Sequence, residues 1–164
     1  MIRWHGHTVP QHLPTCAYSQ LPVPFLFVTI ERRNPASLST PTGIYSLVSL
    51  APPHGRIGVL SGQTGRRADG SISPDVGVQT RDALGNVAAA LADIGSAIKE
   101  VLLLRWLVVG RSNATVVCAA RDTTITEILL GDLPPSSTMS IVDGLVDVRA
   151  LVEVEAWFVY QDGP

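Results

Sequence analysis

The sequence is short of charged residues. Of its 164 residues only 16% are Asp, Glu, Lys or Arg, whereas 46% are hydrophobic. So low a charged fraction predicts that part of the surface is covered by other copies of the chain. Lys99 is the single lysine, and the formal net charge is −2. Without a basic surface or a stripe of alternating basic and aromatic residues, the chain has no electrostatic reason to bind nucleic acid.

Cysteine is equally scarce. Cys16 and Cys118 are far apart and lack the spacing of metal ligands, so they fit a reducing compartment better than a disulfide scaffold. No apolar run is long enough to cross a bilayer, because prolines break residues 21–30 and Arg105 interrupts residues 100–109. The N-terminus also lacks the pattern of a secretion signal. We therefore expect a cytoplasmic protein that has no contact with a membrane.

The first 28 residues show neither helical nor strand periodicity. They mix proline, histidine and aromatic residues, which predicts an irregular N-terminal extension over residues 1–28 and a single domain over residues 29–164. His5, His7 and His12 lie near Cys16 and form one conceivable metal cluster. A simple arm is the favoured interpretation, because no carboxylate or regular structure would hold those ligands in place. We expect no metal site and no cofactor.

Hydrophobic periodicity divides the remaining chain into strands and two helices. Strands are expected at residues 27–33, 44–51, 56–62, 101–109, 136–145 and 150–160. Asp75 is expected to cap a first helix, whose apolar stripe runs from Val76 to Ile98. Asn113 is expected to cap a second helix that ends near Leu130.

This order of elements predicts an α+β domain. Strand hairpins are expected at both ends, with the PPHG turn of residues 52–55 joining the second and third strands. A mixed sheet should therefore carry both helices on one face. The other face must be open to solvent or covered by another subunit, and the low charge favours a subunit.

Two glutamates interrupt the apolar run ALVEVEAWFVY near the end of the chain. Glu153 and Glu155 are two positions apart, so they lie on one face of a strand, while their apolar neighbours lie on the other. Acidic side chains on a covered face are costly unless they have a purpose or a partner. The pair therefore indicates a site.

Three stretches resemble one known family. They are LSGQTG followed by DGSI, then VQTRDALGNVAAALADIGSAIKEV, and finally PPSSTM with ALVEVEAWF. Together they are similar to the Rid (YjgF-like) family, long called endoribonuclease L-PSP, over roughly residues 30–160. This resemblance implies a chorismate-mutase-like α+β fold, a homotrimer and a ligand cleft at each subunit interface. It also implies hydrolysis of reactive enamines and imines to a keto acid and ammonia, without a cofactor.

The resemblance assigns roles to particular residues. It implies catalytic roles for Tyr45, for Ser61 in the Ser-Gly-Gln turn, and for Glu153, which would orient water. Such groups suit the chemistry, because water attacking an iminium carbon needs an acceptor and the departing nitrogen needs a proton. The expected substrate contacts are Gly62, Arg105, Ser136 and Ser137.

Ser136 departs from the family pattern. Active deaminases carry an arginine there, which grips the substrate carboxylate with two hydrogen bonds, and a serine hydroxyl does not replace that planar cation. The loss costs on the order of 2–5 kcal/mol. Hydrolysis of 2-aminoacrylate is therefore doubtful, and a substrate without a carboxylate at the usual position is expected.

Several alternatives stay open for individual residues. Arg105 is either a compensating substrate clamp or, as we favour, part of a structural ion pair with one of the two glutamates. The alternative role of Tyr45 is packing at a subunit contact. The alternative role of Ser61 is hydrogen bonding to the local backbone. Glu155 is expected to be structural. The remaining expectations are a solvated turn charge at Arg149, a core position for Cys118 and no partner for His54.

Two classes of function follow. The first is a small-molecule enzyme of the Rid type with altered substrate choice, and the second is a non-catalytic trimer that binds a metabolite or a partner protein. Ribonuclease activity, which the old family label suggests, is the least favoured because the chain has so little positive charge.

Overall fold

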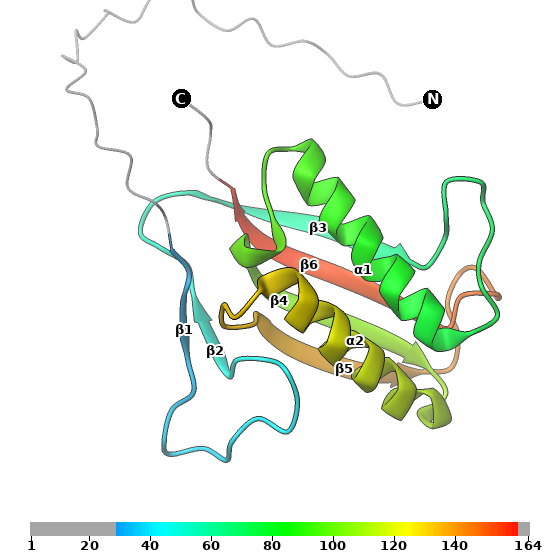
Figure 1. Ribbon diagram of the computed structural model, residues 1–164, viewed down its shortest axis with the longest axis horizontal. Coiled ribbons are helices and arrows are strands. Elements are labelled where there is room, and N and C mark those ends of the chain that lie inside the picture. The colour runs from blue at the N-terminus through cyan, green and yellow to red at the C-terminus, as the bar shows by residue number, and fades with distance from the viewer. Residues whose placement is uncertain (1–28, 161–164) are drawn as a thin grey trace, which may run out of the picture.

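A four-stranded sheet in the order β3-β6-β4-β5 is the centre of the fold. The computed structural model describes residues 29–160 (Figure 1). The four strands are β3 (Arg56–Thr64), β4 (Val101–Val109), β5 (Ser136–Val142) and β6 (Val152–Tyr160). Strand β6 runs antiparallel to both of its neighbours, whereas β5 runs parallel to β4. The prediction of a mixed sheet in an α+β domain is confirmed.

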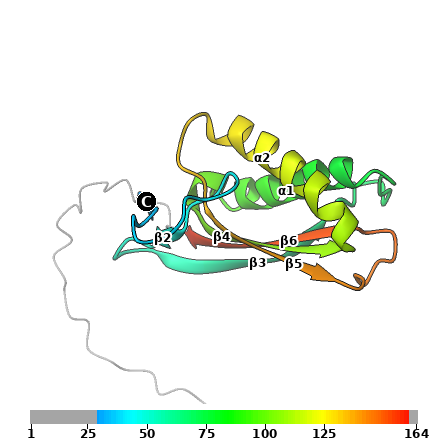
Figure 2. The ribbon, with the colours of Figure 1, turned by 90° about the horizontal axis from the view of Figure 1, so that it is seen from below.

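Both helices cover the same face of this sheet (Figure 2). They are α1 (Val76–Asp93) and α2 (Ala114–Leu129). Helix α1 begins where expected, because Asp75 accepts a hydrogen bond of 2.8 Å from the backbone N–H of Val78. It ends earlier than the apolar stripe predicted, since Gly95 adopts a φ of +76° and breaks the helical path. Ile98 instead starts a short 3₁₀ turn that leads into β4.

The hydrophobic core lies between the sheet and the helices. Strands contribute alternate residues to it, because successive side chains of a strand point to opposite faces. The fully buried members with the largest side chains include Trp106, Leu84, Leu91, Leu104 and Ile125. Burying one such side chain stabilises the fold by about 1.5–3 kcal/mol. Cys118, expected in the core, is only partly buried and lies 3.9 Å from the Sδ of Met139.

The two expected hairpins do not form. Strand β2 (Val48–Leu50) pairs with β1 (Glu31–Arg33) rather than with β3, since Pro52 and Pro53 lack the N–H groups that would continue a ladder. Strands β5 and β6 are consecutive in sequence but are not paired. The crossover through α2 returns β5 parallel to β4 on one edge, which leaves the other edge of β4 for β6.

Arg32 joins the β1-β2 pair to the main sheet. Its guanidinium donates hydrogen bonds to the carbonyls of Val101, at 3.1 Å, and Lys99, at 2.8 Å. Burial lowers the pKa of Arg32 to about 10, an effect that the carboxylate of Asp132 opposes. These contacts hold the β1-β2 pair beside the start of β4.

No helix of the described residues covers the second face of the sheet (Figure 2). This open face carries Glu153, Glu155 and Trp157 of β6 together with apolar side chains of β3. Ile57 and Val59 are 51% and 57% exposed, and Trp157 is 42% exposed. The prediction of an uncovered sheet face is therefore confirmed for a single chain.

Candidate functional site

The two glutamates of β6 lie on the open face but have different surroundings. Glu155 is held by two neighbours, because the indole Nε1 of Trp157 donates a hydrogen bond of 2.6 Å to it and Arg105 lies 3.8 Å from its other oxygen. Arg105 faces Glu155 directly in the β4-β6 register. The sequence predicted an ion pair of Arg105 with one of the two glutamates, and in the structure that glutamate is Glu155.

Glu153 has no hydrogen-bond or ion-pair partner among residues 29–160. Its carboxylate lies against a bulge in β3, where the pairing with β6 shifts register between Leu60 and Gln63. Ser61 and Gly62 form this bulge. A side chain at Gly62 would place its Cβ only 1.7 Å from Oε1 of Glu153, so the glycine provides the space that the carboxylate occupies. Gly62 and Glu153 are thus in contact, and Ser61 is the other residue of the same bulge.

Gly62→Ala is expected to displace the carboxylate of Glu153 from the bulge. The unfolding free energy should change by less than about 1 kcal/mol, because the clashing atoms belong to the flexible end of a side chain. Thermal denaturation and a crystal structure of the variant would measure both effects. Gly144→Ala is a control outside the helices, since nothing lies within 4 Å of an added Cβ there and its φ is outside the left-handed region. An unmoved Glu153 in the variant would contradict this account of Gly62.

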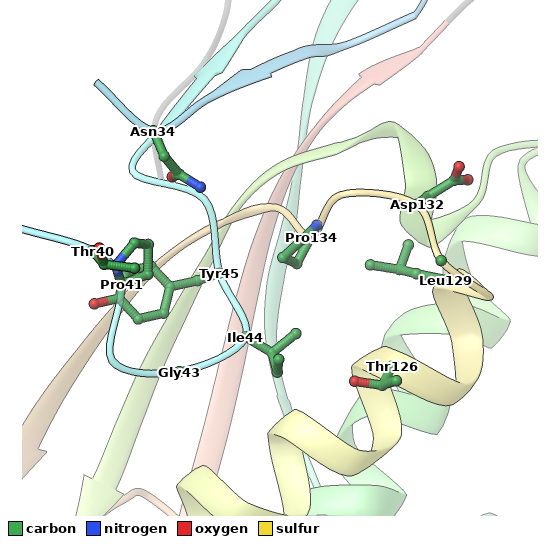
Figure 3. Close-up of a pocket in the computed structure, with 11 residues that line it drawn as sticks. Asn34, Thr40, Pro41, Gly43, Ile44, Tyr45, Thr126, Leu129, Asp132 and Pro134 are labelled. Carbon is green, nitrogen blue, oxygen red and sulfur yellow. The ribbon is translucent and has the colours of Figure 1, made fainter. Parts of the chain in front are cut away.

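Tyr45 lies outside this cluster, in the loop between β1 and β2. The next residue, Ser46, anchors the loop to the segment before β5, because its hydroxyl donates to the carbonyl of Pro134 at 2.7 Å and its N–H to that of Pro135 at 3.1 Å. Tyr45 lines a pocket of about 330 Å³ between this loop and the C-terminal end of α2 (Figure 3). Ile44 and Leu129 form apolar parts of its wall, and Thr126 and Asp132 polar ones.

Ser136 is the first residue of β5, next to the Tyr45 loop. It forms a bridge with Ser46, and its hydroxyl lies 3.0 Å from that of Ser49. The neighbouring Ser137 has a buried hydroxyl with no partner among the described residues. Ser137 pairs with the buried Leu104 of β4, which places its side chain toward the helices rather than on the open face.

Within one chain, Ser136 and Glu153 belong to different regions. Ser136 is opposite Leu103 of β4, whereas Glu153 is opposite Leu107, four residues further along the strand. They are therefore separated by two strand spacings across the sheet, about 10 Å, and by four residues along the strands, about 13 Å. The structure of one chain therefore does not bring the Ser136 region and the Glu153 cluster together.

Two other arginines near these regions have acidic partners. Arg149 contacts Asp147 at 2.7 Å in the turn before β6, as expected for a turn charge, and this contact lowers the pKa of Asp147 to about 2. Arg121 contacts Asp122 at 2.7 Å and lies over the ring of Tyr45. The sequence reasoning missed Arg121, although an arginine on the apolar stripe of a helix is a visible signal.

Metal and membrane features are absent from the part of the chain that the structure describes. No three His, Cys, Asp or Glu side chains of residues 29–160 are grouped so that they could hold a metal ion. None of the helices in this range is both long and apolar enough to span a membrane. His54 is exposed in the turn between β2 and β3, and the histidines and cysteine of the extension, His5, His7, His12 and Cys16, lie outside the described residues.

Comparison with known proteins agrees with this architecture. The family model described as Endoribonuclease L-PSP matches residues 38–159. The Rid-family protein YyfB of Yersinia pestis, of unknown function, has a similar structure, with a TM-score of 0.71 and 25% identity over 80% of this chain and 98% of its own.

Two further structures are similar. Rv2704 of Mycobacterium tuberculosis, a member of the YjgF/YER057c/UK114 family, has a TM-score of 0.53 and 27% identity over 70% of this chain and 86% of its own. The yjgF product of E. coli has a TM-score of 0.60 at 22% identity, over 74% of this chain and 91% of its own, and shows the shared fold alone. No curated protein matches this sequence.

Proposed function

This chain belongs to the endoribonuclease L-PSP (Rid) family, and from that premise we propose that it hydrolyses small imines or enamines, or tautomerises related compounds. The observation that carries the proposal is the carboxylate of Glu153, which has no partner within residues 29–160 and lies beside Gly62 on a sheet face that no element of the described chain covers. A carboxylate without a partner is available to accept a proton from water and to return it to a departing nitrogen. Glu155, held by Arg105 and Trp157, has the structural role.

The site is proposed to form between copies of the chain in a homotrimer. The low charged fraction and the exposed apolar residues Ile57, Val59 and Trp157 support burial of the open face against other copies. Contact between copies would bring the Tyr45 and Ser136 region of one copy toward the Glu153 cluster of the next. We place the trimer in the cytoplasm, where the thiol of Cys118 would stay reduced.

The proposed substrate lacks a carboxylate at the position that arginine grips in the family's deaminases. Ser136 offers only a hydroxyl there, and that hydroxyl already contacts Ser49. Arg105 does not replace the missing arginine, because it is paired with Glu155 and faces Thr138, two register positions along β4 from the residue that faces Ser136. Neutral imines of aldehydes or ketones therefore fit the cleft better than 2-iminopropionate.

Ammonia release from imines generated in situ tests this function. We expect measurable hydrolysis of neutral imines and only slow hydrolysis of 2-iminopropionate. Activity on 2-iminopropionate that equals that of arginine-containing relatives would refute the substrate choice. The absence of hydrolysis with every imine tested would favour a non-catalytic trimer that binds a metabolite, which the loss of the arginine at Ser136 also supports.

A further inference from the structure

Arg121 is buried where an apolar residue is expected. On α2 the inward positions are Val117, Arg121, Ile125 and Leu129. Arg121 is 6% exposed, and among the buried side chains of residues 29–160 it is the only charged one. Burial of a cation is unfavourable unless its contacts compensate for the lost hydration. The contacts of Arg121 therefore indicate what it contributes.

The guanidinium of Arg121 contacts both its own helix and the loop between β1 and β2. Its Nε donates to the carboxylate of Asp122 at 2.7 Å, which balances the charge. Its central carbon lies 5.9 Å from the centroid of the Tyr45 ring, within the range of a cation–π interaction. Arg121 thus holds the side chain of a residue whose backbone is already fixed through Ser46.

Gly43 makes this contact possible. An added Cβ at Gly43 would lie 2.7 Å from Nη2 of Arg121 and 3.1 Å from the carboxylate of Asp122. Its φ lies outside the left-handed region, so the backbone conformation does not require glycine there. Gly43 and Arg121, 78 positions apart in the sequence, are therefore matched in space.

We propose that Arg121 is a positioning residue that fixes the ring of Tyr45 on the wall of the pocket beside α2. Direct binding of a ligand is a different role and fits poorly, because the side chain of Arg121 is almost fully buried and Asp122 balances its charge. The structural part of this inference is independent of the proposed function, and its kinetic part rests on that function.

NMR of ¹³C-labelled tyrosine tests the structural part on the full chain. The sequence has three tyrosines, and Tyr45→Phe assigns the signal of Tyr45. Arg121→Leu should move that signal and leave the signal of Tyr160 in place, whereas Arg121→Lys should move it less. Arg111→Leu, at an exposed position before α2, is the matched control. An unchanged Tyr45 signal in Arg121→Leu would overturn the proposal.

Steady-state kinetics with a neutral imine test the kinetic part. Displacement of the ring should lower kcat about 10–100-fold in Arg121→Leu with little change in KM, and Arg121→Lys should regain most of it. A raised KM at unchanged kcat would mean that Arg121 binds the ligand, which contradicts a positioning role. If the wild-type chain hydrolyses no imine, the proposed function fails, and Arg121 is then judged by the readouts that need no activity.

A double-mutant cycle gives a third readout that needs no activity and no fully stable variant. Gly43→Ala should lower the Tm of the wild-type chain but have a much smaller effect in the Arg121→Leu background, because the clash with Nη2 is then gone. Equal effects of Gly43→Ala in both backgrounds would show that the two residues are not coupled and would overturn the proposal.

Discussion

Glu153→Gln should lower kcat for imine hydrolysis by about 10²–10⁴-fold, the range that a positioned general acid or base contributes. The amide keeps the shape of the side chain beside Gly62 but neither accepts nor returns a proton. Because Glu153 has no ion-pair partner among the described residues, the Tm and the oligomeric state should stay close to those of the wild type. Ammonia release and size-exclusion chromatography measure the two effects.

Glu155→Gln is the matched control on the same strand face. It removes the charge that faces Arg105 at 3.8 Å, an exposed pair worth about 0.2–1 kcal/mol, and keeps an oxygen for the indole of Trp157. We expect a small loss of stability and nearly unchanged kcat. If the two variants lose activity equally, Glu153 has no special role in proton transfer.

Ser136→Arg is expected to raise kcat/KM for 2-iminopropionate by about 10–10³-fold. The arginine would supply the bidentate partner of a carboxylate, an interaction worth on the order of 2–5 kcal/mol at a desolvated site. The gain requires that the remaining cleft residues are in place, so it also tests the assignments of Tyr45 and Glu153. Hydrolysis of 2-iminopropionate and of a neutral imine by the same variant gives the change in preference.

Ser136→Lys separates charge from geometry. A lysine brings the same positive charge without the planar fork, so its gain should be clearly smaller than that of arginine. Both substitutions remove the contact with Ser49, which makes their stabilities comparable. A Ser136→Arg protein that folds but gains no activity would show that the cleft differs from that of the deaminases in more than this residue.

The sequence predicted those features that depend on local patterns. The cap at Asp75 and the stripe of α1 follow from residues within a few turns of one another, and both are present. The lateral order of the strands is not a local property. The chain passes through α2 before it forms β5, which pairs with one edge of β4. Strand β6 then pairs with the other edge of β4 and with β3, so the prediction of a C-terminal hairpin of β5 and β6 was wrong.

The same distinction applies to the candidate site. The resemblance assigned Ser61, Gly62 and Glu153 to one cleft, and in the structure a short bulge of β3 faces the strand that carries Glu153. The different surroundings of Glu153 and Glu155 depend on Arg105, a strand away, and on the rotamer of Trp157, neither of which a single sequence specifies. Arg121 was missed because its role depends on Gly43, which is distant in the sequence.

The position of β6 has a consequence for the synthesis of the protein. This strand comprises residues 152–160 and lies between β3 and β4, so β3 has no other neighbour in the sheet. A growing chain that has emerged only as far as β5 exposes β3 and one side of β4 as unpaired edges, the kind of surface on which chains aggregate. The sheet is completed only after the ribosome has released the strand that carries Glu153, so folding and completion of the candidate site depend on the same nine residues.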